Sequence, residues 1–176
     1  MPVILAVIGA VAAAAFFILR ARNAAHAATD LVDMANDVRL AARRFGFRRN
    51  TNLHPAESIE DPSIAIAGIA SAFLELDDLP TSDQRSALTR AMSGVLGLSR
   101  QDADELTILG RWIANECGSP DAAVSRLSRK LVRMKGQESF QPLLTIVNAT
   151  LTASSTSINT RQKEALDDVK RAFRIS

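Results

Sequence analysis

The stretch Asp61–Pro80, DPSIAIAGIASAFLELDDLP, decides the fold of this chain. An aspartate followed by a proline is typical of a helix start, because the aspartate caps the free backbone N–H groups and proline is tolerated at the first helical position. Apolar residues then recur at helical spacing, at Ile66, Ile69, Phe73 and Leu76. The pattern predicts a long apolar helix that ends at a corner near Pro80.

Further helix starts recur along the chain after this corner. All but the one after Gly136 combine a capping residue with apolar residues at helical spacing downstream. The expected starts are Thr81 with Gln84, Ser99 with Asp102, Ser119 with Pro120, the residues after Gly136, and Asn159 or Thr160. Gaps of two to eight residues between helices favour antiparallel neighbours. The sequence therefore predicts an all-α bundle of about six to seven helices over residues 56–176.

An apolar run precedes the bundle. From Val3 to Leu19 there are seventeen residues without a charge or a strong polar group. As a helix the run would span roughly 25 Å, at the short end for a hydrocarbon core of about 30 Å. No basic residue precedes it, whereas Arg20 and Arg22 follow it. This order predicts an uncleaved anchor at residues 1–22 in a bacterial inner membrane, with the N-terminus outside and the rest in the cytoplasm. A signal peptide cleaved within Asn23–Ala28 is the alternative.

Residues 23–55 read as a basic amphipathic helix followed by a linker, and the linker-like sequence TNLHPAESIE continues to residue 60. Seven arginines follow the apolar run, at Arg20, Arg22, Arg39, Arg43, Arg44, Arg48 and Arg49. Against three aspartates they give residues 1–49 a charge of +4, while the rest of the chain carries −2, so the formal total of +2 is unevenly distributed. The segment is expected to contact anionic lipid head groups or an acidic partner. The acidic remainder argues against general nucleic-acid binding.

Two stretches, AFLELDDLPTSDQRSALTRAM (72–92) and SRQDADELTILGRWIANECG (99–118), resemble the tellurite-resistance TerB-like domain. A faint internal echo accompanies them, since PTSDQRSAL at residue 80 aligns with INTRQKEAL at residue 158. The echo reflects either two pseudo-equivalent helix pairs or a chance match of two helix caps. The resemblance covers about 56–176. It implies an all-α bundle and, for some members of the family, metal binding by acidic loops.

The chain departs from the family at those loops. Asp77 matches the aspartate of the first loop, but Gln84 stands where the family has a glutamate, and Ser155 and Gln162 occupy the second loop. A hard cation needs several oxygen ligands with carboxylate charge. We therefore expect neither a metal nor another cofactor. The carboxylates that could still attract an ion weakly are Asp77, Asp78 and Asp83.

Catalytic chemistry finds little support in the sequence. His26 lies beside the predicted anchor and His54 in the expected linker, and neither has an evident partner residue. Cys117 is the only cysteine, so it cannot form an internal disulfide, and we interpret it as a small residue buried late in a helix. An enzyme of unrecognised type would have to use His54 or Cys117. We expect no enzyme and no small-molecule substrate.

Three features indicate binding to other molecules instead. A small-residue stripe in the apolar run would let another transmembrane helix approach closely, or it reflects alanines that any anchor tolerates; its members are Ala6, Gly9, Ala10, Ala13 and Ala14. A cationic helix face is either solvated or a dock for lipid or an acidic subunit; it comprises Arg126, Arg129, Lys130, Arg133 and Lys135. Trp112 fills a second core layer or anchors a protein partner.

These observations define two functional hypotheses. The first is a non-enzymatic accessory or assembly subunit that packs on an integral complex of the inner membrane, with a respiratory-chain complex as candidate host. The second, implied by the resemblance, is a TerB-like ion-responsive protein of envelope stress or tellurite resistance.

Overall fold

A computed structural model describes residues 34–77, 79–153 and 158–175. These residues form helices and turns, and no strand occurs among them, so the predicted all-α class is confirmed. Residues 34–44 are helical. The elements after them are the 3-10 helix η1 (Pro55–Ser58), α2 (Pro62–Leu74), α3 (Ser82–Leu96), α4 (Arg100–Glu116), α5 (Pro120–Lys135), the 3-10 helix η2 (Gly136–Ser139), α6 (Phe140–Thr152) and α7 (Thr160–Ala172).

Several predicted features lie outside the described residues. They are the anchor at 1–22 with its small-residue stripe (Ala6, Gly9, Ala10, Ala13, Ala14), Arg20, Arg22, His26, Asp78 and Ser155. Among the residues that the structure does describe, no helix combines the length and the apolar character needed to cross a bilayer. The description below concerns the compact unit formed by Val38–Ser176.

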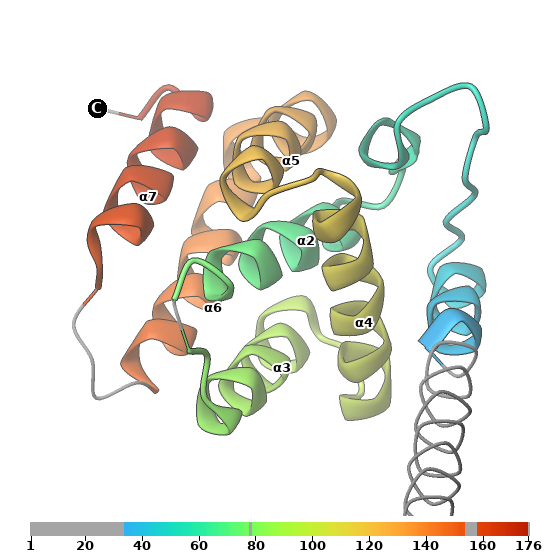
Figure 1. Ribbon diagram of the computed structural model, residues 1–176, viewed down its shortest axis with the longest axis horizontal. Coiled ribbons are helices and arrows are strands. Elements are labelled where there is room, and N and C mark those ends of the chain that lie inside the picture. The colour runs from blue at the N-terminus through green and yellow to red at the C-terminus, as the bar shows by residue number, and fades with distance from the viewer. Residues whose placement is uncertain (1–33, 78, 154–157, 176) are drawn as a thin grey trace, which may run out of the picture. The chain divides into compact units, whose positions relative to one another are not determined.

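Helix α2 is the centre of this unit. Every residue from Ile64 to Leu74 is buried, not only the apolar stripe of the sequence pattern. A helix that is apolar on all sides is stable only when other elements surround it. Helices α3, α4, α5 and α6 all contact α2, and Figure 1 shows it in the middle of the bundle. Helix α7 completes the unit by packing on α5.

Each predicted helix start is confirmed, and local capping sets five of them, whereas α6 begins after η2 without a side-chain cap. The Asp61 carboxylate accepts from the Ser63 N–H at 2.8 Å. Thr81 and Gln84 form both arms of a capping box, with distances of 3.2 and 2.7 Å. The caps of α4, α5 and α7 are Ser99, Ser119 and Asn159. These bonds satisfy N–H groups that a helix leaves free at its first turn.

The internal echo is local. Gln84 and Gln162 are both buried third residues of capping boxes, so the two helix starts are built alike. Helix α3, however, packs on α4 and α6, whereas α7 packs on α5. The two helices therefore share a cap but have different packing partners.

Two helices approach each other closely where α2 crosses α4. A Cβ atom on Gly110 of α4 would lie 2.6 Å from the carbonyl carbon of Ala67 and 2.8 Å from the nitrogen of Gly68. A Cβ on Gly68 would lie 2.7 Å from Leu127 Cδ1 of α5. Backbone atoms cannot yield as a flexible side chain can. Glycine at these positions therefore permits the tight packing of α4 and α5 on α2.

The segment that we expected to be a linker forms part of the bundle. Ala56 and Ile59 are fully buried in the core, and Ala41 is buried further upstream. The compact unit accordingly begins at Val38, N-terminal of the residue-56 boundary that we expected for the domain. We refer to residues 44–58 as the strap. Too short for a periodic pattern, it contributes to the core through single side chains.

We expect Gly110→Ala to lower the free energy of unfolding by about 1–3 kcal/mol, because the added methyl overlaps backbone atoms of α2. Gly94→Ala in α3 is the matched control, since a Cβ there meets nothing within 4 Å. That control should raise stability by about 0.5–1 kcal/mol through helix propensity. Thermal unfolding of both variants by circular dichroism tests this. Equal effects of the two substitutions would contradict the role given to the crossing.

Candidate functional site

The strap runs along the outer side of α4 and is held there by ion pairs. Arg44 pairs with Asp102 and with Glu105, the latter at 3.2 Å, near the start of α4. Arg49 pairs with Glu116 at 3.6 Å, at the end of the same helix. The strap therefore runs parallel to α4 over most of its length.

An aromatic contact lies between these two groups of ion pairs. The rings of Phe47 and Trp112 meet edge to face, with centroids 5.9 Å apart and an interplanar angle of 72°. The Arg49 guanidinium lies 5.8 Å from the Trp112 ring centroid, within the range of a cation–π interaction. Trp112, predicted either to fill a second core layer or to anchor a partner, thus packs against the strap of its own chain.

The end of the strap is fixed to α4 and α5. His54 Nδ1 accepts from the Ala56 N–H at 3.2 Å, which leaves Nε2–H to donate to the Glu116 carbonyl at 3.1 Å. Lys130 Nζ donates to the Glu57 carbonyl at 2.8 Å, and Arg133 pairs with the Glu57 carboxylate at 2.7 Å. Lys130 and Arg133 of the predicted cationic face are therefore occupied by the strap.

The remaining arginines of the predicted sets are differently placed. Arg39, Arg43 and Arg48 are exposed, and no ion pair involves them within the described part of the chain. Leu40, 58% exposed, shares a helix face with Arg43, since residues three or four apart lie on the same face. On α5, Arg126 is half-buried, and Arg129 is exposed and donates to Ser125 Oγ at 2.7 Å.

Two helix corners meet near the predicted acidic loop. Gln84 Nε2 donates to Asp77 Oδ2 at 3.0 Å, and Asn159 Nδ2 donates to the Leu76 carbonyl, also at 3.0 Å. Asp83 lies in the first turn of α3, where a negative charge interacts favourably with the positive end of the helix dipole. Across residues 34–77, 79–153 and 158–175, no group of three metal-ligating side chains occurs. The corner is held by the two hydrogen bonds that the side-chain amides of Gln84 and Asn159 donate.

Cys117 caps the C-terminal end of α4 and is half-buried. Burial raises the pKa of its thiol above the ordinary value of 9.0, against an opposing contribution from Arg126. The Sγ–H donates to the Ile113 carbonyl at 3.4 Å. A protonated, hydrogen-bonded thiol is a poor nucleophile.

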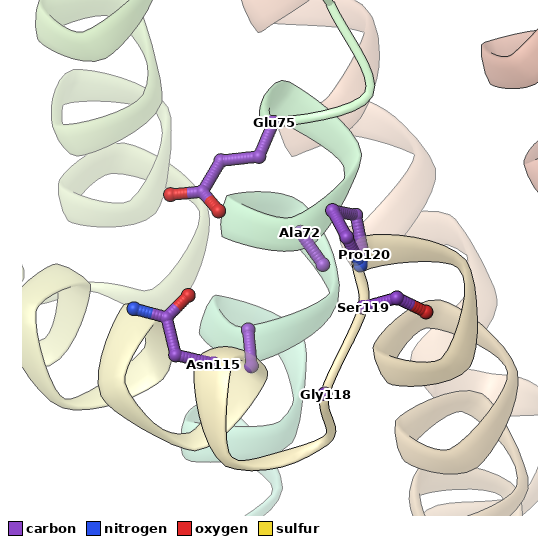
Figure 2. A pocket seen from close by; sticks show the side chains of 7 residues that line it. Ala72, Glu75, Asn115, Gly118, Ser119 and Pro120 are labelled. Carbon is purple, nitrogen blue, oxygen red and sulfur yellow. The ribbon is translucent and has the colours of Figure 1, made fainter.

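A small pocket lies where three helix ends meet, shown in Figure 2. Its volume is about 100 Å³. Its lining comes from the end of α2, the end of α4 and the start of α5, through Ala72, Glu75, Ala114, Asn115, Gly118, Ser119 and Pro120. The Glu75 carboxylate pairs with Arg111 Nε at 2.9 Å. None of these residues belongs to the site residues that the sequence suggested.

The strap contacts could be recognised in the sequence only in part. Glu105 and Glu116 are eleven residues apart and so lie on a similar face of α4, which marks an acidic stripe. Nothing in the sequence says which of the seven arginines meets that stripe. The pocket has no sequence signal, because it arises where separate helices end.

Comparison of the chain with protein-family models, with curated proteins and with solved structures finds no match. The likeness to TerB-like domains therefore rests on the quoted residues, and activity has to be argued from the geometry alone. That geometry offers a strap bound to α4 and α5, a set of exposed arginines beside it, and a small pocket at the helix ends.

We expect Phe47→Ala to shift the fluorescence emission of Trp112, the only tryptophan, to longer wavelength, because removing the ring exposes the indole to water. Arg49→Gln should produce a smaller shift, because the cation–π contact and the pair with Glu116 are both lost. Arg48→Gln is the matched control, since Arg48 is exposed and forms no ion pair within the described residues. An unchanged spectrum for Phe47→Ala would show that the strap does not cover Trp112.

The strap should also respond to acid. The hydrogen bond from the Ser99 hydroxyl and the charge of Arg44 hold the pKa of Asp102 below its ordinary value of 3.8. A carboxyl with a lowered pKa stabilises the fold above its unfolded pKa, and this contribution disappears as the pH falls through the folded pKa. The midpoint temperature of thermal unfolding should therefore fall less steeply between pH 5 and about pH 2 for Asp102→Asn than for the unchanged chain. If the midpoint temperatures of the two proteins fell in parallel with pH, Asp102 would not have the lowered pKa given to it here.

Proposed function

We propose that the chain is a non-enzymatic, membrane-anchored accessory subunit of an integral complex in the bacterial inner membrane. The apolar run would act as the anchor, and the helical bundle would cover the cytoplasmic side of the partner. We also propose the TerB-like class for the bundle, supported by the two capping boxes at helix corners. A respiratory-chain complex is the candidate host.

The observation that carries this proposal is the division of the arginines. Arg44 and Arg49 are committed to acidic residues of α4, whereas Arg39, Arg43 and Arg48 are exposed without an ion pair in the described residues. A cation near an anionic bilayer gains on the order of 1 kcal/mol. Three such cations, soon after an apolar run, favour a bundle held against anionic head groups.

The strap gives the proposed anchor a mechanical role. An unstructured linker would let the bundle diffuse freely below the membrane. Here the chain is instead bound to α4 from Arg44 to His54 and to α5 through Glu57. The proposed anchor would therefore lead into a segment that is bound to the bundle from Arg44 onward.

The partner contact within the membrane is expected at the small-residue stripe, because small side chains let helices approach closely. Ala13→Leu should therefore remove the partner complex from the protein when it is purified in mild detergent, while the protein stays in the membrane fraction. On a helix Ala15 falls on the opposite side from the stripe. Ala15→Leu is thus a matched control that should retain the partner.

Deletion of residues 1–22 completes this experiment. We expect the shortened chain to leave the membrane fraction and to lose the partner, as read by mass spectrometry of the purified material. If the unchanged protein migrates alone at its own mass in mild detergent, the accessory-subunit proposal fails.

A further inference from the structure

The pocket of Figure 2 is suited to one side chain rather than to a metabolite. Its volume of about 100 Å³ is below the roughly 300–1,000 Å³ of pockets that hold small-molecule ligands. Pockets of this smaller kind receive single anchoring side chains at protein interfaces. The chemistry of its walls indicates which side chain.

The donors at the start of α5 are already used. Pro120 has no N–H group, and the Ala122 N–H donates to Ser119 Oγ at 3.2 Å. The Ala123 N–H donates to the Ser119 carbonyl at 2.9 Å, and the first-turn Asp121 pairs with Arg161 at 2.7 Å. The positive end of α5 is thus largely satisfied, and it offers little to an anionic ligand.

The groups still available are acceptors. Glu75 uses Oε1 for Arg111, and its side chain is a quarter exposed. Asn115 is exposed, and Figure 2 shows its amide on the same side of the pocket as the Glu75 carboxylate, while the Ser119 hydroxyl points away. Helices α2 and α4 both end at the pocket, and neither has a basic residue in its last turn. The last carbonyls of both helices already accept hydrogen bonds, for example Ala114 from the Cys117 N–H and Leu74 from the Asp77 N–H, so the negative charge available at the pocket is that of Glu75.

We propose that this pocket receives a lysine or arginine side chain of a partner protein, which donates to the Glu75 carboxylate and the Asn115 amide oxygen. The ion pair with Arg111 demonstrates that Glu75 accepts a guanidinium at the pocket rim. The inference depends on the proposed function only for the source of the cation, namely the partner subunit. Binding of the cationic group itself can be measured without that partner.

The full chain in detergent micelles is titrated with N-acetyl-arginine methylamide and, separately, with N-acetyl-lysine methylamide, while backbone amide resonances are followed by NMR. We expect saturable shifts at Gly118 and Ser119 for at least one of the two probes. N-acetyl-norleucine methylamide, which has a similar length and no charge, should leave these resonances unchanged. Saturation by the neutral probe at the same concentration would mean an apolar site and would overturn the proposal.

Two variants move the affinity in opposite directions. Glu75→Gln should weaken binding by roughly three- to fivefold, the range expected for a part-exposed ion pair. Arg111→Gln frees the second carboxylate oxygen and should strengthen it. Glu138→Gln, an equal charge change on η2 outside the pocket, is the control. The proposal fails if no probe saturates, or if Glu75→Gln behaves like Glu138→Gln. If the unchanged protein copurifies with no partner complex, the accessory-subunit role is contradicted. The outcome of the titration does not depend on that result.

Discussion

The crossing of α2 and α4 at Gly68 and Gly110 is the constraint on which the structure depends. A single methyl group at Gly110 would overlap backbone atoms of α2, so the two helices touch almost directly. This contact fixes α4 beside α2, and together with α3, α5 and α6 it buries α2 on all sides. The outer side of α4 then carries the acidic residues that hold the strap, and the ends of α2 and α4 meet to form the pocket. The placement of the strap and that of the pocket both follow from this one close approach.

The strap joins weak interactions into one attachment. An exposed ion pair contributes about 0–1 kcal/mol alone, and each arginine pair here is at least partly exposed. The edge-to-face contact of Phe47 with Trp112 adds roughly 0.5–1.5 kcal/mol beyond its buried area. Burial of Ala56 in the strap and of Ile59 directly after it supplies an apolar contribution that salt does not screen. The strap is therefore part of the bundle, and it begins directly after the exposed Arg39 and Arg43.

The sequence predicted what local chemistry determines. Thr81 with Gln84 identified a helix start because a capping box closes within four residues. Long-range partners were out of reach, since the arginine that meets Asp102 is chosen by packing between segments almost sixty residues apart. The role of Gly110 could not be predicted either, because it depends on contact with the backbone of the neighbouring helix α2. The expected linker lacked periodicity and still supplied Ile59 to the core.

The proposed function requires the strap to lie on the cytoplasmic side of the inner membrane, and labelling in whole cells tests this most directly. Asn52 is exposed on the strap, and Cys117, the only native cysteine, can be replaced by serine. A chain with Asn52→Cys and Cys117→Ser should resist a membrane-impermeant maleimide in intact cells and react after permeabilisation. Reaction in intact cells would place the bundle outside and contradict the proposed anchor orientation, partner and function together.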